Sequence, residues 1–107
     1  MQVPDDRLVP DWDESNIDHI ARHDIRPEQV EEVYYGEGPL PTFGIRLPAR
    51  GPSPSGETRY RLWGTDASGV LLEVIVAPFP KQGIWRCVTA YRMSKAARRV
   101  YLRRVRR

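Results

Sequence analysis

The sequence has little of what metal centres and disulfide-linked folds require. Of its 107 residues, one is cysteine and two are histidine. Cys87 has no partner for an intramolecular disulfide, and its apolar neighbours predict a small buried side chain rather than a nucleophile. Two histidines without a third ligand at a suitable spacing argue against a zinc site. We therefore expect neither a metal nor a cofactor.

Long apolar runs are also missing. The longest covers residues 70–77 and is interrupted by Glu73, whereas a helix that crosses a bilayer needs roughly 20 apolar residues. The first dozen residues are acidic and contain prolines, which is not the composition of a secretory signal peptide. We expect a cytoplasmic protein with no membrane partner.

Acidic residues are absent from residues 86–107, which contain nine lysines and arginines. Residues 1–38 carry eleven acids and three arginines, and residues 39–85 carry three acids and five bases, so the net charge of +3 conceals a strongly basic carboxyl end. Such polarity favours a polyanion at that end. Two alternatives stay open: pairing with the acidic N-terminal helices, and a solvated arginine-rich helix.

Length and patterning predict one domain over residues 1–107, with a flexible N-terminal arm at residues 1–10. Two helices are expected next. Asp13 or Ser15 is a suitable cap for the first, and Pro27 is well placed as the first residue of the second. The predicted helices span residues 13–24 and 27–36.

Residues 37–57 are rich in proline and glycine, which predicts a long loop within the domain with one extended segment at residues 42–47. Apolar patterns then predict three strands, and their short connections favour an antiparallel sheet. Trp63 and Trp85 fall in these patterns and are expected in the core. The predicted strands span residues 58–64, 70–77 and 84–91.

The last segment predicts a helix that begins after Ser94, a good N-cap, and runs to the end of the chain. One face must pack on the domain, and it comprises Ala97, Val100, Tyr101 and Val105. The opposite face carries cations that favour phosphate or carboxylate ligands. The predicted fold class is α+β, with two N-terminal helices, an antiparallel sheet of three to four strands, and a C-terminal helix.

Three segments of the chain are similar to one known family in their order and spacing. WDESNIDHIARHDIRPEQVEEV, ETRYRLWGTDASGVLLEVIVA and RCVTAYRMSKAARRVY together resemble the BrnT family, the ribonuclease toxins of bacterial type II toxin–antitoxin pairs. The resemblance covers nearly the whole chain except the proline-rich loop. It implies a RelE-like fold, metal-independent RNA cleavage, and a DNA-binding antitoxin that neutralises the enzyme.

Two positions depart from the family's pattern. The family has an Arg-x-Ile-Ser-Ala-Arg segment, and Tyr91 stands where its second arginine is found. In the following helix, Ala97 stands where a glutamate precedes Arg98. If that glutamate takes part in catalysis in the family, this protein must use another acid or do without one.

Metal-free RNA cleavage needs a base for the 2′-hydroxyl, cations for the charged transition state, and an acid for the leaving oxygen. Arginine suits the second task because its fork binds two phosphate oxygens. Glu57 is a candidate base, although a strand-end carboxylate paired with an arginine is an equal alternative. The candidate catalytic residues are Glu57, Arg59, Arg86, Tyr91 and Arg92. The candidate RNA-binding residues are Ser94, Lys95, Arg98, Arg99 and Arg103.

His19 and His23 lie four residues apart, on one face of the first predicted helix. They are a possible acid–base pair, but we favour a structural role for His23 at the end of that helix. Two further functions are weighed against the toxin: a catalytically silent relative that binds RNA or a partner protein, and a small DNA-binding domain. The last is disfavoured because the sequence indicates no helix-turn-helix. The sequence leaves the oligomeric state open.

Overall fold

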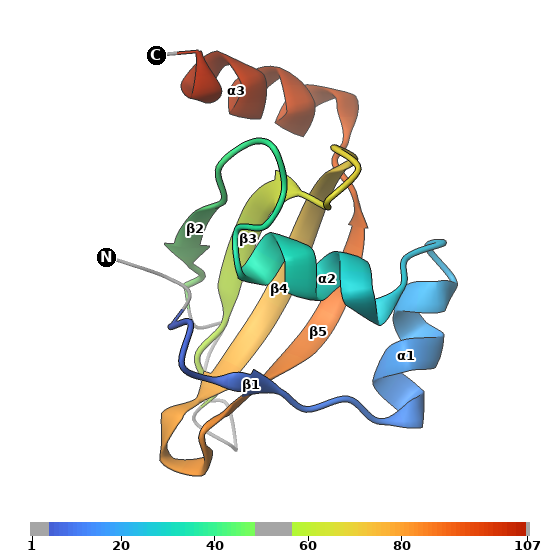
Figure 1. The fold of residues 1–107 in the computed structure, drawn as a ribbon, viewed down its shortest axis with the longest axis vertical. Helices are drawn as coiled ribbons and strands as arrows, with labels where there is room; N and C mark the ends of the chain where they lie inside the picture. The colour runs from blue at the N-terminus through green and yellow to red at the C-terminus, as the bar shows by residue number, and fades with distance from the viewer. Residues whose placement is uncertain (1–4, 49–56, 107) are drawn as a thin grey trace.

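The computed structural model describes residues 5–48 and 57–106, and within them three helices accompany a five-stranded sheet (Figure 1). The strands are β1 (Val9–Pro10), β2 (Phe43–Arg46), β3 (Tyr60–Thr65), β4 (Leu71–Phe79) and β5 (Ile84–Arg92). Their order across the sheet is β1-β5-β4-β3-β2. The pair β1 and β5 is parallel, and the other neighbouring strands are antiparallel. The fold is therefore α+β with a mixed sheet.

The predicted antiparallel sheet of three to four strands is confirmed for β2 to β5, whose neighbouring pairs are all antiparallel, but the prediction omitted a fifth strand that pairs in parallel. The extended segment predicted inside the proline-rich loop is confirmed as β2, whereas residues 49–56 of that loop lie outside the described residues. The unpredicted strand is β1, which is two residues long and too short to show an alternating pattern. Its Pro10 has no N–H for a ladder, which suits the edge of a sheet.

The predicted flexible arm at residues 1–10 is wrong for its second half. Leu8 is buried, with 5% of its surface exposed, and the N–H of Asp11 donates to the carbonyl of Trp85 at 2.9 Å. Burial of an apolar side chain and pairing with β5 both fix this segment. Residues 1–4 lie outside the described residues.

The two N-terminal helices are confirmed, and both begin where their capping residues predict. In α1 (Glu14–Ala21), the Asp13 carboxylate accepts the N–H of Asn16 at 2.8 Å, which satisfies a free donor of the first turn. The helix α2 (Pro27–Tyr34) begins at its proline. It ends before Gly36, whose φ of 66° is a left-handed conformation that glycine adopts without strain.

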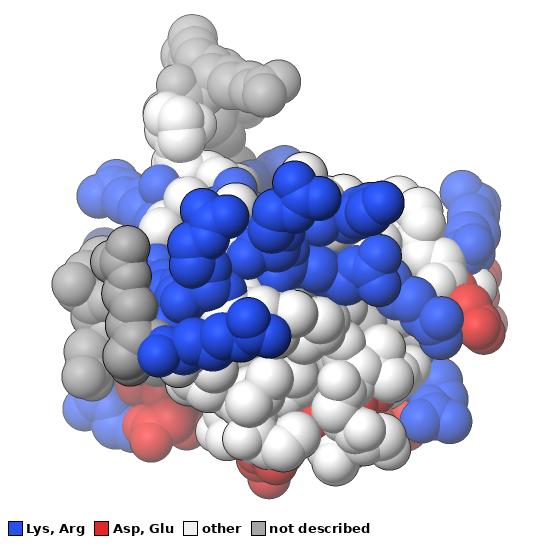
Figure 2. Space-filling view, turned by 90° about the horizontal axis from the view of Figure 1, so that it is seen from above, with Lys and Arg blue, Asp and Glu red and all other residues white. Residues whose placement is uncertain are grey.

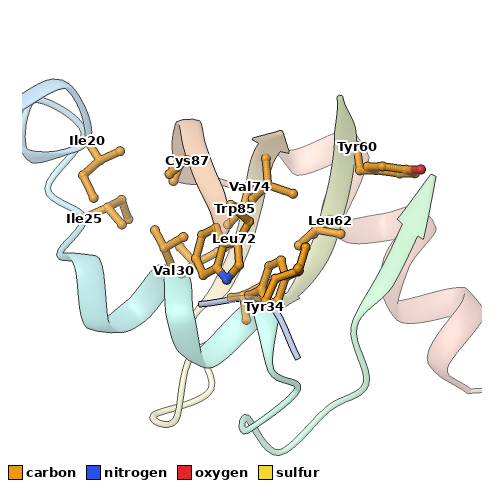
Figure 3. Packing of buried hydrophobic residues seen from close by; sticks show 14 residues of the cluster. Ile20, Ile25, Val30, Tyr34, Tyr60, Leu62, Leu72, Val74, Trp85 and Cys87 are labelled. Atoms are coloured by element: carbon orange, nitrogen blue, oxygen red, sulfur yellow. The ribbon is translucent and has the colours of Figure 1, made fainter. Parts of the chain in front are cut away.

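The core lies between α2 and one face of the sheet, with Trp85 near its centre (Figure 3). The Trp85 side chain is fully buried and stacks on the ring of Tyr34, with centroids 4.1 Å apart. Cys87 is also buried, which raises the pKa of its thiol to about 12 and confirms a packing role. Replacing a buried aromatic such as Trp85 by alanine costs about 3–5 kcal/mol, so this layer supplies much of the stability.

The turn between β3 and β4 is held by Asp66, of which only 3% is exposed. Its carboxylate accepts the N–H groups of Ser68 and Val70 at 2.9 and 2.8 Å, and the side-chain amide of Gln29 at 2.9 Å. Burial alone would raise the pKa of Asp66, but the hydrogen bonds together outweigh it, and the pKa is lowered. The turn and α2 are thereby joined through a carboxylate that needs no cation.

The third helix, α3 (Lys95–Val105), lies across the end of the sheet where β2 begins and β5 ends (Figure 1). It begins after Ser94, whose hydroxyl accepts the N–H of Ala97 at 3.1 Å. Tyr101 anchors the helix, because its ring is fully buried beside Phe43 and its hydroxyl donates to a backbone carbonyl at 2.6 Å. None of the described helices has the length and apolar character needed to cross a membrane.

The apolar face of α3 is narrower than its sequence predicts. Tyr101 is buried, and Ala97 and Val105 are half-buried, but 51% of Val100 is exposed. The helix is thus fixed mainly by one aromatic side chain, and most of its circumference faces solvent.

Candidate functional site

Cations cover the solvent side of α3. We call this the α3 cationic surface, and its members are Arg92, Lys95, Arg98, Arg99, Arg103 and Arg106. All six side chains are exposed, and those of the helix share one side because their spacing follows its 3.6-residue period. Figure 2 views this end of the molecule and shows lysine and arginine side chains gathered across it. The arrangement presents several positive charges to one ligand.

No acid in the described part of the chain forms an ion pair with the α3 cationic surface. Ion pairs in the described part of the chain join Arg7 to Asp5, Arg59 to Glu57, and Arg86 to two aspartates. None of these includes Arg92 or a residue of α3. Clustered charges of one sign raise the local potential and attract counter-ions, so this surface favours a polyanion.

Ser94 has a different part in this region. Its predicted position as the N-cap is confirmed, and its hydroxyl oxygen already accepts a hydrogen bond from the backbone of α3. Ser94 therefore fixes the start of the helix that carries the cations.

Arg86 lies away from this surface, beside β1 and the start of α1. Its guanidinium donates to Asp11 at 2.9 Å, to the carboxylate of Asp13, and to the side-chain oxygen of Asn16 at 3.0 Å. Two carboxylates and an amide therefore occupy the fork that the sequence assigned to phosphate. Arg86 joins β5 to the N-terminal segment, and it is not part of the α3 cationic surface.

Glu57 and Arg59 pair with each other, at an N–O distance of 2.6 Å. The pair agrees with the alternative interpretation of Glu57, that of a strand-end carboxylate paired with an arginine. They precede β3, whereas Arg92 lies at the level of Gly64 in the sheet register. Five residues of strand between Arg59 and Gly64 correspond to about 16 Å. The fold therefore separates Glu57, Arg59 and Arg86 from Arg92 and α3.

Tyr91 belongs to a row of polar and aromatic side chains on the sheet face opposite the core. The register places Phe43, Trp63, Glu73 and Tyr91 side by side on successive strands. The indole N–H of Trp63 donates to Glu73 at 2.7 Å, and the hydroxyl of Tyr91 donates to the other oxygen of the same carboxylate. Trp63 is thus half-buried in this row and not in the core, contrary to the sequence prediction.

The hydrogen bond to Glu73 is the main reason that the pKa of Tyr91 is raised to about 12, and burial adds to the effect. A phenol that donates to a carboxylate loses its proton less readily because its anion would face that negative charge. Tyr91 therefore stays protonated and keeps Glu73 in place. The guanidinium of Arg61 lies 4.2 Å from the ring centre of Trp63 and completes the row.

Both histidines lie next to this row, at the edge of the sheet. The Nε2 atom of His19 and the hydroxyl oxygen of Thr89 are 3.1 Å apart and form a hydrogen bond. The His19 and His23 rings are in edge contact, with centroids 5.8 Å apart, and the His23 ring contacts Tyr91 at 5.9 Å. Both imidazoles are exposed. The sequence placed them together but gave no sign that they would meet Tyr91.

Glu73 and Thr89 are the residues of this cluster that sequence reasoning missed. Glu73 is a lone acid in an apolar strand, which is a detectable signal, but its partners depend on the register between strands. Within residues 5–48 and 57–106, no three side chains of histidine, cysteine or acidic type are grouped so that they could hold a metal ion.

No model of a known protein family matches the sequence, and no curated protein matches it either.

Proposed function

We propose that this protein is a metal-independent endoribonuclease, the toxin of a bacterial type II toxin–antitoxin pair that acts in the cytoplasm. The α3 cationic surface carries the proposal. Six exposed cations form no ion pair with an acid of the described residues. They suit the closely spaced phosphates of a nucleic acid, because each contact between a cation and a phosphate releases counter-ions and thereby favours binding. The BrnT-like segments of the sequence favour RNA over other polyanions.

The architecture supports the same proposal. Two helices, an antiparallel run of strands from β2 to β5, and a terminal helix occur in the order expected for a RelE-like fold. Arg92 ends β5 next to Tyr91 and is exposed. A guanidinium at this junction would hold a phosphate between α3 and the sheet, where a bidentate fork gives both affinity and orientation.

The proposal also implies how the enzyme is controlled. A DNA-binding antitoxin that neutralises it needs acidic side chains opposite the α3 cationic surface, since that surface has no ion pair of its own in the described residues. Its binding would compete directly with RNA.

The test is incubation of the purified protein with total RNA in the presence of a chelator, together with expression in a bacterial host. We expect RNA fragments, and growth arrest that a co-expressed neighbouring reading frame relieves. Arg92→Gln should relieve arrest without changing the melting temperature. Intact RNA together with normal growth would contradict the proposal.

A second function, a silent relative that binds RNA without cutting it, is favoured by one observation. Arg59 and Arg86, two of the cations expected to stabilise the transition state, are already paired with acids of the chain. In that case affinity for RNA should fall steeply with salt while the RNA stays intact. The same incubation therefore separates the two functions.

A further inference from the structure

One group of titratable side chains lies outside the α3 cationic surface, where α1 and the turn after it meet β5. His19, at the end of α1, and His23, in the turn after it, are both exposed. Their rings contact each other, and the ring of His23 contacts Tyr91 on β5. Two adjacent imidazoles in solvent are the side chains best suited to giving and taking protons near neutral pH.

The surroundings restrict both rings. The hydrogen bond between His19 Nε2 and Thr89 fixes the orientation of one imidazole and leaves its other nitrogen to act on a ligand. Tyr91, which contacts His23, is itself held by Glu73, and Glu73 is held by Trp63. A series of contacts thus runs from β3 across the sheet to the histidines, as is typical of side chains that must keep a set geometry.

We infer that His19 and His23 are the catalytic acid and base of the RNA cleavage proposed above, with Thr89, Tyr91 and Glu73 as positioning residues. The inference rests on the proposed function. The cluster is contiguous in the chain with the α3 cationic surface, because Tyr91 directly precedes Arg92. The inference requires that an RNA whose phosphates bind α3 continues past Arg92 to the two imidazoles.

The reaction balances without a metal or a cofactor. One neutral imidazole takes the proton of the 2′-hydroxyl, and the 2′-oxygen forms a bond to phosphorus. The bond from phosphorus to the 5′-oxygen breaks, and the second imidazole, which is protonated, gives its proton to that oxygen. The products are a 2′,3′-cyclic phosphate and a 5′-hydroxyl, and one proton has moved from one histidine to the other. Proton exchange with water then returns both histidines to their starting protonation states.

The experiment compares His19→Gln, His23→Gln and the double variant with the natural protein, using a single-stranded RNA oligonucleotide in a chelator. Asp18→Asn is the matched control, because Asp18 is exposed on the same helix. We expect each histidine variant to cleave at least about 100-fold more slowly, and the control to cleave at the natural rate. Affinity for an oligonucleotide with a 2′-deoxy sugar at the cleaved position should change by less than about threefold, because the cations supply it.

A second variant tests the positioning residues. Tyr91→Phe keeps the aromatic ring and removes the hydroxyl that donates to Glu73. We expect kcat to fall by about tenfold with KM unchanged, and the imidazole resonances of His23 to move in the NMR spectrum. A tyrosine with a merely structural role would leave kcat unchanged.

The outcomes separate the two proposals. If the natural protein leaves all RNA intact, the proposed function fails and this inference fails with it. If the natural protein cleaves and the double variant cleaves equally fast, only the assignment of the histidines is overturned. Loss of cleavage with an equal loss of affinity would also overturn it, since the histidines would then only bind. Products that lack a 2′,3′-cyclic phosphate would also overturn the assignment of the histidines.

Discussion

Arg86 and the α3 cationic surface differ in the side chains that surround them. Arg86 lies beside β1 and α1, where Asp11, Asp13 and Asn16 occupy its guanidinium. The members of the α3 cationic surface lie at the end of the sheet and form no ion pair with any acid of residues 5–48 and 57–106. The difference shows that an arginine is open to a ligand only where the fold brings no carboxylate to it.

The same difference decides between two interpretations of the charge distribution. The sequence left open whether the acidic N-terminal helices pair with the basic tail. In the described residues the N-terminal acids that form ion pairs do so with Arg7 and Arg86, and not with α3. Polarity along the chain therefore becomes polarity in space, which is the condition for a polyanion site.

The largest effect on RNA affinity is expected from the cations of α3, which form no ion pair in the described residues. Replacing Arg98, Arg99 and Arg103 together by glutamine should lower RNA affinity by roughly 100-fold at physiological salt. The slope of log affinity against log salt should fall by about 2, since each lost contact with single-stranded RNA removes about 0.7. The melting temperature should stay within about 2 °C, because these side chains contact solvent. Titration of a labelled oligonucleotide at several salt concentrations measures both quantities.

A smaller effect, on stability, is expected for Arg86, which is paired with acids of the chain. Arg86→Gln removes the guanidinium that links β5 to Asp11, Asp13 and Asn16. Because all three groups of this link are partly exposed, we expect the melting temperature to fall by only about 4 °C. RNA affinity should remain within about twofold of the natural value. A large loss of affinity without a change in melting temperature would show that Arg86 does bind the ligand.

The smallest effect is expected for Asp66, a carboxylate that is held by hydrogen bonds rather than by a cation. It concerns how stability depends on pH. The pKa of Asp66 is lowered by neutral N–H donors, so its contribution to stability is present above about pH 4 and is lost as the pH falls through the lowered value. High salt should leave this acid dependence unchanged, whereas it should reduce the contribution of Arg86. Urea unfolding between pH 2 and 7, at low and high salt, measures it. Asp66→Asn serves as the control, because it should flatten the curve below pH 4.

Local signals explain how much of the fold was predictable. Asp13, Pro27, Gly36 and Ser94 act within a few residues of where they stand, and each one marks a helix end that the structure confirms. The three long strands are confirmed for the same reason, because alternation is a property of neighbouring residues.

The failures concern contacts between residues that are far apart in the chain. The pairing of β1 with β5 joins positions about 75 residues apart, and the separation of Arg86 from Asp11 is also 75 residues. No local pattern specifies either contact. The candidate site divides in the same way: the cations of α3 follow from helical spacing, whereas Glu73 meets Tyr91 only through the register of β4 and β5.

The central claim is that the unpaired cations of α3, and not the paired arginines, receive RNA. The most direct measurement is an NMR titration that follows the side-chain Nε–H signals of the arginines as a short single-stranded RNA is added. We expect the signals of Arg92, Arg98, Arg99 and Arg103 to move with the occupancy of the RNA, and those of Arg59 and Arg86 to remain in place. Movement of the Arg86 signal while the α3 signals stay unchanged would contradict the account.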